Sequence, residues 1–242
     1  MHYKYYCLYQ KYIAVKTPTL NIQNSPEDFV EEICNCIYVQ YLKSIEKSNK
    51  FTFVLSGGNT PKAVFTYLAE NYLDRINWGK VYFFWLDERC TAPNNLDNNY
   101  FMAHKYLLSK LKGIGGVYRM KGELDRNKAA SLYSQELKSF FGGKEISFDF
   151  IILGMGTDGH IASIFPGLER TAEAKVTTFY TKRRYNGYYR LSLGLDVINA
   201  STYKLLILKG AEKIKVFKKK NNFNLLPKDY VNFSHVIYLD NE

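Results

Sequence analysis

A histidine and an aspartate follow a glycine-rich turn in the second half of the chain. The apolar run from Phe148 to Leu153 has the length of a strand, and Gly154, Asp158 and His160 come soon after it. Parallel-sheet proteins place their chemistry at such carboxyl ends of strands. An imidazole there can take up and return a proton near neutral pH. We therefore predict that His160 and Asp158 are catalytic.

Residues 154–159 of this turn also spell G-x-G-x-x-G, a pattern typical of dinucleotide-binding sites. Pro166 interrupts any helix that follows, after barely two turns. A dinucleotide site also needs an acidic residue about twenty positions further on, and residues 179–184 contain none. We interpret the glycines instead as allowing the backbone to pass close to a sugar.

A second glycine turn, Ser-Gly-Gly-Asn-Thr-Pro, covers residues 56–61. Glycines between a strand and a helix start let backbone N–H groups converge on an anion at the positive end of the helix. The pattern lacks the Gly-Lys-Ser/Thr ending of a nucleotide P-loop. Phosphate binding and a plain tight turn before a capped helix both remain open for this segment.

Four charged residues complete the set of candidate site residues. Asp87 and Arg89 follow a predicted strand, where they could orient sugar hydroxyls or balance developing negative charge. Arg190 opens a later strand and Lys213 lies near a helix start, so that both could neutralise a phosphate dianion. The alternative for each is an ordinary surface charge.

Alternating strands and helices must position these residues. Apolar runs predict strands at residues 51–55, 81–86, 148–153, 175–181, 189–193, 203–208 and 235–239. Capping residues and apolar spacing predict helices from Pro26 to about Asn49 and at about 60–74, 98–111, 127–141 and 211–220. The pattern indicates an α/β fold, a mostly parallel twisted sheet with helices on both faces. No linker or repeat divides the chain, so we expect residues 1–242 to form one domain.

Composition narrows the class of protein. Of 242 residues, 46% are apolar and 23% charged, as in ordinary globular proteins. No apolar run is long enough to span a membrane, and the first residues lack the apolar core of a signal peptide. We therefore expect a cytoplasmic protein with no membrane partner. The four cysteines form no C-x-x-C pair, which favours inert thiols over a metal site or disulfides.

The net charge of +10 raises the alternative of nucleic-acid binding. The basic residues are spread along the chain, and the densest run, Lys218 to Lys220, lies at a predicted helix end. A solvated helix end explains that run, so we expect no nucleic-acid partner. The excess charge would instead help to attract an anionic small molecule.

Taken in order, these motifs resemble the family of 6-phosphogluconolactonases and glucosamine-6-phosphate isomerases. The matching segments are residues 56–61, 87–89, 98–100, 154–160, 165–167, 190–193, 198–200, 210–213 and 237–240. The resemblance implies a sugar-phosphate isomerase-like, modified Rossmann-type fold. It further implies hydrolysis of 6-phospho-D-glucono-1,5-lactone to 6-phosphogluconate in the oxidative pentose phosphate pathway, with no metal and no cofactor.

The resemblance also implies roles for the candidate residues. His160 would act as the general base that activates water, beside Asp158. The substrate-binding residues would be Ser56, Gly57, Gly58, Asn59, Thr60, Asp87, Arg89, Arg190 and Lys213. Within this set, the glycine turn, Arg190 and Lys213 would hold the phosphate.

The chain departs from the family pattern at three places. Asn98 and Asn99 stand where the family usually has Ser-Asn. Asn59 stands where the family usually has Ser or Thr, and a Pro-Lys-Pro-Pro segment is replaced by residues 181–184, Thr-Lys-Arg-Arg. Whether the Asn59 side chain takes part in phosphate binding is therefore left open, and we assign no role to Lys182.

Two other functions within this fold have to be weighed. A glucosamine-6-phosphate deaminase would carry an acid shortly after the histidine, whereas residues 161–167 contain no carboxylate, and Arg89 is the lactonase-like residue. A non-catalytic sugar-phosphate sensor would need a DNA-binding helix-turn-helix, which the chain does not show. In some lineages such lactonases are fused to glucose-6-phosphate dehydrogenase, and the polar ends of this chain would suit a fragment of that fusion.

Overall fold

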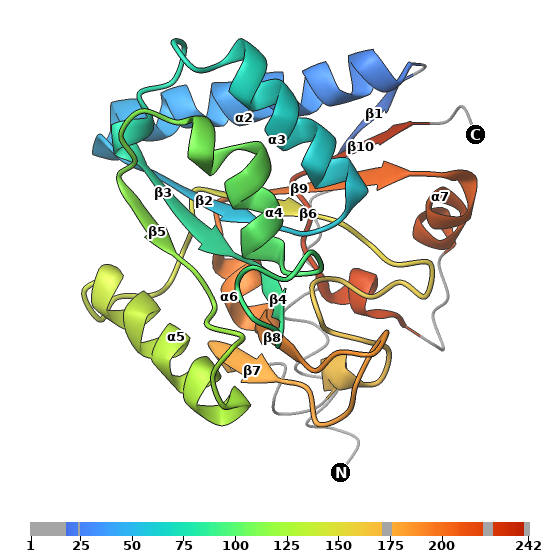
Figure 1. Ribbon diagram of the computed structural model, residues 1–242. Coiled ribbons are helices and arrows are strands. Elements are labelled where there is room, and N and C mark those ends of the chain that lie inside the picture. The colour runs from blue at the N-terminus through green and yellow to red at the C-terminus, as the bar shows by residue number, and fades with distance from the viewer. Residues whose placement is uncertain (1–17, 24, 171–175, 220–224, 240–242) are drawn as a thin grey trace.

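A computed structural model of the chain describes residues 18–23, 25–170, 176–219 and 225–239. Its centre is a seven-stranded sheet in which all neighbouring strands are parallel (Figure 1). In spatial order the strands are β1 (Thr19–Gln23), β10 (His235–Leu239), β9 (Tyr203–Lys209), β6 (Phe150–Leu153), β2 (Phe51–Leu55), β3 (Val81–Trp85) and β5 (Gly116–Tyr118). The predicted α/β fold with a parallel sheet is confirmed.

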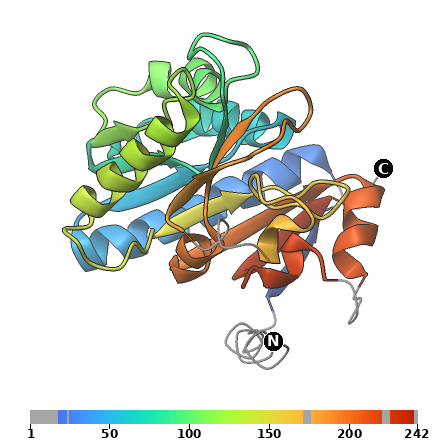
Figure 2. The same ribbon diagram turned by 90° about the horizontal axis from the view of Figure 1, so that it is seen from below.

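The central strands are apolar throughout because helices cover both of their faces. Every residue of β2 and of β6 is buried, which is typical of parallel strands inside an α/β protein. The helices are α2 (Pro26–Ser48), α3 (Asn59–Asn71), α4 (Asn99–Tyr106), α5 (Arg126–Phe140), α6 (Leu195–Ala200) and α7 (Ala211–Lys218). Helices α2 and α3 lie together on one side of the sheet, and α5 and α6 on the other (Figures 1 and 2).

Helix α2 shows how local sequence sets an element. The Oγ of Ser25 accepts a hydrogen bond from the N–H of Asp28 at 3.1 Å, and Pro26 occupies the first helical position. The helix ends at Asn49, whose φ of 54° lies in the left-handed region. Its buried face includes Phe29 and Ile33, as the four-residue spacing predicts. Both ends agree with the predicted bounds.

A second, three-stranded antiparallel sheet was not predicted. It consists of β4 (Asp87–Arg89), β8 (Arg190–Leu193) and β7 (Thr178–Tyr180), in that order. The predicted strands near 175–181 and 189–193 exist, but they belong to this sheet, and the polar residues after Trp85 form a strand rather than a loop. Leu86 joins the sheets, since its N–H donates to Leu55 and its carbonyl accepts from Leu193.

Other differences concern short elements. The predicted helix at 98–111 divides into α4 and a 3₁₀ turn, Leu108–Lys110. Helix α3 was predicted at about 60–74, with Thr60 as its N-cap. It runs from Asn59 to Asn71, and its N-cap is Gly58. The sequence analysis missed β1, β5 and α6. Lys175 and Lys220, at the ends of two predicted elements, lie outside the described residues.

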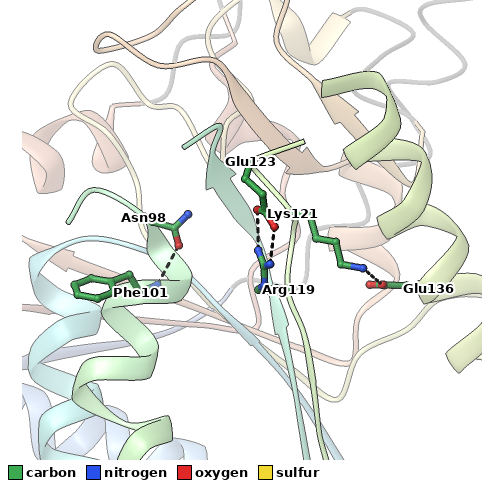
Figure 3. A network of polar contacts seen from close by, with 6 residues as sticks. All are labelled: Asn98, Phe101, Arg119, Lys121, Glu123 and Glu136. Atoms are coloured by element: carbon green, nitrogen blue, oxygen red, sulfur yellow. Dashed lines mark hydrogen bonds and ion pairs between the residues drawn. The ribbon is translucent and has the colours of Figure 1, made fainter. Parts of the chain in front are cut away.

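Two ion pairs fix the connection between β5 and α5 (Figure 3). Both terminal nitrogens of Arg119 contact the carboxylate of Glu123, at 2.9 and 2.6 Å, and the Nζ of Lys121 lies 3.0 Å from Glu136 on α5. Because α5 packs against β7 and β8, this connection supports the sheet that carries Arg190. In the part of the chain described, no helix combines the length and apolarity needed to cross a bilayer.

Candidate active site

A pocket of about 230 Å³ opens where β2, β3 and β6 end and the small sheet begins. Carboxyl ends of parallel strands are the usual place for a site in such folds. Ten of the eleven predicted site residues line it: Ser56, Gly57, Gly58, Asn59, Thr60, Asp87, Arg89, His160, Arg190 and Lys213. The eleventh, Asp158, does not line the pocket but contacts His160.

The pair of His160 and Asp158 has the geometry of an oriented base. Asp158 Oδ1 lies 2.6 Å from His160 Nδ1 and accepts the backbone N–H of His160 at 3.1 Å. A carboxylate on Nδ1 favours a proton at that nitrogen and a lone pair on Nε2. The His160 side chain is 29% exposed and lines the pocket, so water in the pocket can reach the imidazole.

Two glycines of this turn have different reasons to be glycine. A Cβ on Gly156 would stand 2.2 Å from the His160 ring, so any side chain there would displace the imidazole. Gly159 has a φ of 81° and packs against Leu226. Between β6 and α6 the described residues contain no α-helix. The dinucleotide alternative therefore lacks the helix N-terminus that it requires.

The turn after β2 presents donors to the pocket. The backbone N–H groups of Asn59 and Thr60 open α3, where they have no intrahelical acceptor. The Oγ of Ser56 is buried without a hydrogen-bond partner. A Cβ on Gly57 would lie 1.9 Å from the Oδ1 of Asn99, so this glycine allows α4 to approach the turn. Together these groups form a potential anion-binding cradle.

Asp87 is held by two residues whose roles the sequence analysis missed. Its Oδ2 accepts a hydrogen bond from the Oγ of Ser163 at 2.6 Å, and its carbonyl accepts from the Nδ2 of Asn99 at 2.9 Å. Both partners also line the pocket. Asn99 lay in a motif quoted for the family resemblance, whereas nothing in the sequence singled out Ser163.

The neighbouring carboxyl group, Glu88, is completely buried. Its Oε1 accepts the N–H groups of Arg89 and Asn99, both at 2.7 Å, and its Oε2 accepts that of Tyr100 at 2.8 Å. Burial raises the pKa of Glu88 to about 8, although the three hydrogen bonds oppose this change. Glu88 therefore fixes the start of α4 beside the pocket.

Three cations face the same space from different elements. Arg89 comes from β4, Arg190 from β8 and Lys213 from α7. The Nε atoms of both arginines are buried and have no hydrogen-bond partner. Burial lowers the pKa of Arg190, and the charge of Asp87 opposes this change. Such a convergence of donors suits an anionic ligand.

Comparison with known proteins agrees with this geometry. The family described as glucosamine-6-phosphate isomerases/6-phosphogluconolactonase matches residues 24–235. The chain belongs to this family. A 6-phosphogluconolactonase of Treponema pallidum is 34% identical over 162 residues, which cover 66% of this chain and 67% of that protein.

A probable chloroplastic 6-phosphogluconolactonase of Oryza sativa is 32% identical over 209 residues, which are 82% of this chain and 64% of the rice protein. The chain thus spans a little under two thirds of the rice family member. The crystal structure of a 6-phosphogluconolactonase from Thermotoga maritima superposes with a TM-score of 0.81 at 27% identity. It covers 92% of this chain and 99% of the other.

Three of the four cysteines lie in the described residues, and all three are free. Burial raises the pKa of Cys36 and of Cys90 to about 11 and raises that of Cys34 further. Cys7 lies outside the described residues. Among the described residues, no group of three or more His, Cys, Asp or Glu side chains is arranged to hold a metal ion.

Proposed function

We propose that this chain hydrolyses 6-phospho-D-glucono-1,5-lactone to 6-phosphogluconate in the oxidative pentose phosphate pathway. The observation that carries the proposal is the oriented pair of His160 and Asp158 in a pocket lined by three cations. An ester and a phosphate are the two groups that such a site would accommodate. The lactonases among its relatives support the same reaction.

In the proposed mechanism the phosphate binds the turn at residues 56–60, Arg190 and Lys213. This anchoring holds the lactone carbonyl near His160 and supplies orientation. The Nε2 of His160 removes a proton from water while the water oxygen bonds to C1. The C1–ring oxygen bond then breaks, and the imidazolium returns the proton to the departing oxygen.

The remaining polar groups would stabilise and orient. Arg89 is suited to balance negative charge on the carbonyl oxygen as the tetrahedral intermediate forms. Asp87, fixed by Ser163 and Asn99, is suited to grip a sugar hydroxyl. Asp158 would keep His160 in the reactive tautomer and stabilise the imidazolium. No atom changes oxidation state in this reaction, so we propose that it needs no redox cofactor.

One contact favours lactone hydrolysis over the deaminase reaction. The deaminase relatives carry a carboxylate shortly after the histidine to help open the sugar ring. In this chain the ring of Phe165 lies 4.6 Å from the His160 ring, centre to centre. An apolar ring beside the base suits hydrolysis of a lactone, because the lactone ring opens in the hydrolytic step itself and needs no additional carboxylate.

The wider setting belongs to the same proposal. We propose that the chain acts as one lactonase domain in the cytoplasm. The reaction that supplies its substrate is the oxidation catalysed by glucose-6-phosphate dehydrogenase. Functional coupling to that enzyme, or covalent fusion with it in a longer protein, would shorten the path of a lactone that also hydrolyses slowly in water.

The test is to generate the phospholactone in situ from glucose 6-phosphate and follow its disappearance with and without the protein. A parallel assay measures ammonia release from glucosamine 6-phosphate. We expect faster loss of the lactone, retained after treatment with EDTA, and no ammonia. Ammonia release without lactone hydrolysis would replace the proposal by the deaminase function.

A further inference from the structure

A tight turn joins β7 to β8 and reaches the mouth of the pocket. The N–H of Tyr185 donates to the carbonyl of Tyr188 at 2.8 Å, and the reverse bond is 3.2 Å long. Asn186 and Gly187 between them have φ values of 50° and 81°. These are the features of a type I′ hairpin turn, for which Asn-Gly is the preferred pair. The turn is therefore a defined structure that holds its flanking side chains in place.

The ring of Tyr185 lies against an active-site residue. It stacks on Phe165 with centres 3.6 Å apart and planes 2° from parallel. Phe165 in turn lies beside the His160 ring, with ring centres 4.6 Å apart. Asp158 holds one edge of the imidazole, and this aromatic pair limits the movement of its face. Both constraints act on the same proposed base.

The turn is also hydrogen-bonded to Arg190 and is linked to Arg89 through Asp97. The carbonyl of Tyr185 accepts a hydrogen bond from Nη2 of Arg190 at 3.2 Å. The hydroxyl of Tyr188 donates to Oδ2 of Asp97 at 2.6 Å, and the carbonyl of Asp97 accepts from Nη1 of Arg89. Two residues of this turn, Tyr185 and Tyr188, thus contact Arg190 itself and the residues that support His160 and Arg89.

We propose that Tyr185 is a positioning residue for lactone hydrolysis, holding Phe165 and through it the His160 ring in the reactive orientation. This inference rests on the proposed function for its kinetic consequences. Tyr185 itself does not line the pocket, although its neighbour Asn186 does. A side-chain substitution leaves the Tyr185 carbonyl, and so its hydrogen bond with Arg190, in place. The effect of removing the ring would therefore fall on kcat.

The first experiment compares Tyr185→Leu, Tyr185→Phe and the wild type in the lactone assay. Tyr185→Leu removes the flat stacking partner, and a misplacement of a reactive group by about 1 Å can cost about 100-fold. We expect kcat to fall about 10- to 100-fold, with KM little changed. Tyr185→Phe keeps the stack and should restore kcat.

Arg183→Ala is the matched control. Arg183 donates from Nε to the hydroxyl of Tyr185 at 2.8 Å and lies over the same ring, but on the solvent side. Its removal disturbs the hairpin surface without touching the stack on Phe165, so kcat should stay at the wild-type value. An equal loss in Arg183→Ala and Tyr185→Leu would show that the hairpin has only a general structural role.

A measurement without turnover separates this inference from the proposed function. The NMR resonance of His160 Hε1 senses the orientation of Phe165, so Tyr185→Leu should move it and Tyr185→Phe should leave it in place. If Tyr185→Leu fails to fold, Gly187→Ala replaces it in this measurement. An alanine at a φ of 81° strains the turn and should also move the His160 resonance. An unmoved resonance in Tyr185→Leu, or in Gly187→Ala where Tyr185→Leu does not fold, overturns the positioning role. A wild type without lactonase activity overturns the proposed function alone.

Discussion

Two histidines of this chain lie at opposite ends of the parallel strands, and each has a polar partner. The carboxyl edge and the amino edge denote the sides of the sheet at which the strands end and begin. His160 follows β6 at the carboxyl edge and pairs with Asp158 at 2.6 Å. His235 begins β10 at the amino edge, where its Nδ1 lies 3.0 Å from the hydroxyl of Tyr203 and 4.0 Å from the Sγ of Cys36. A list of residue types alone would rank these two clusters as equally reactive.

Their surroundings make them different. His235 is buried, which lowers its pKa and keeps the imidazole neutral, and burial raises the pKa of Cys36 to about 11, so the thiol stays protonated. His160 has a carboxylate partner, a glycine beneath its ring and a pocket in front of it. Partners are therefore common to both edges, while access for substrate is found at the carboxyl edge.

The largest expected effect tests this contrast directly. His160→Ala removes the proposed base and should lower kcat by about 10²- to 10⁴-fold, the usual contribution of general acid–base catalysis. Binding of 6-phosphogluconate, measured by calorimetry, should stay close to the wild-type affinity. His235→Gln should leave kcat within about twofold, since no step in catalysis is assigned to it. Comparable losses in both variants would end the distinction between the two edges.

The next effect concerns the space beneath the imidazole. Gly156→Ala would place a methyl group 2.2 Å from the His160 ring and should lower kcat about 100-fold. Gly154→Ala is the comparison, because its Cβ meets no atom within 4 Å and can affect only the open pocket, hence KM. The lactone assay on both variants decides the point. A normal kcat in Gly156→Ala would mean that the ring position is not critical.

A smaller effect is expected at the proposed phosphate end. Lys213→Ala removes a cation that lines the pocket and should raise KM about 10-fold, since a hydrogen bond to a charged group contributes about 1.5–3 kcal/mol. Lys215→Ala changes an exposed lysine on the same helix and serves as the control. Steady-state kinetics at constant ionic strength would measure both. An unchanged KM in Lys213→Ala contradicts the phosphate assignment.

A different kind of effect concerns stability rather than rate, and its sign differs between Glu88 near the pocket and Lys204 at the amino ends of the strands. Burial raises the pKa of Glu88 from 4.5 to about 8, so the folded state holds a proton that the unfolded state releases. Glu88 therefore stabilises the fold fully below about pH 4.5 and loses this contribution as the pH rises to about 8. Each pKa unit is worth about 1.4 kcal/mol.

Denaturant unfolding from pH 5 to 9 measures this effect in Glu88→Gln and the wild type. The free energy of unfolding of the wild type, relative to the variant, should fall with rising pH. At the amino edge, Lys204 is buried and its pKa is lowered, so the folded state binds fewer protons. Relative to Lys204→Met, the wild type should gain stability as the pH rises toward 10.5, the ordinary pKa of a lysine, so this pair is measured up to that pH. If the stability curves of the wild type and a variant run parallel over the pH range, the direction of the pKa shift assigned to that residue is wrong.

Much of the fold could be predicted because its signals are local. Strands such as β2 and β6 are apolar runs bounded by turns, and α2 carries its own cap and stop signals. Short elements escaped prediction. Strand β4 is the polar tripeptide Asp-Glu-Arg, which is extended because its backbone pairs with β8, about a hundred positions away. Nothing in its own composition favours a strand.

The site shows the same division. His160, Asp158 and the glycine turn could be recognised from residue types at strand ends. Ser163, Phe165 and Tyr185 could not be assigned from their types, because their importance depends on contacts with Asp87 and His160 that only the folded chain makes. The Asn-Gly pair after Tyr185 is a recognisable hairpin signal, and it was the one local clue available there.

The pairing of β4 with β8 has a consequence for synthesis on the ribosome. Strands β2, β3 and β5 are available once roughly half of the polypeptide has emerged, yet Asp87 and Arg89 find their partner strand only when residue 193 has left the exit tunnel. Lys213 arrives later still. Chains that end before residue 193 therefore lack the small sheet that carries Asp87, Arg89 and Arg190, and we expect the pocket to be completed late in folding.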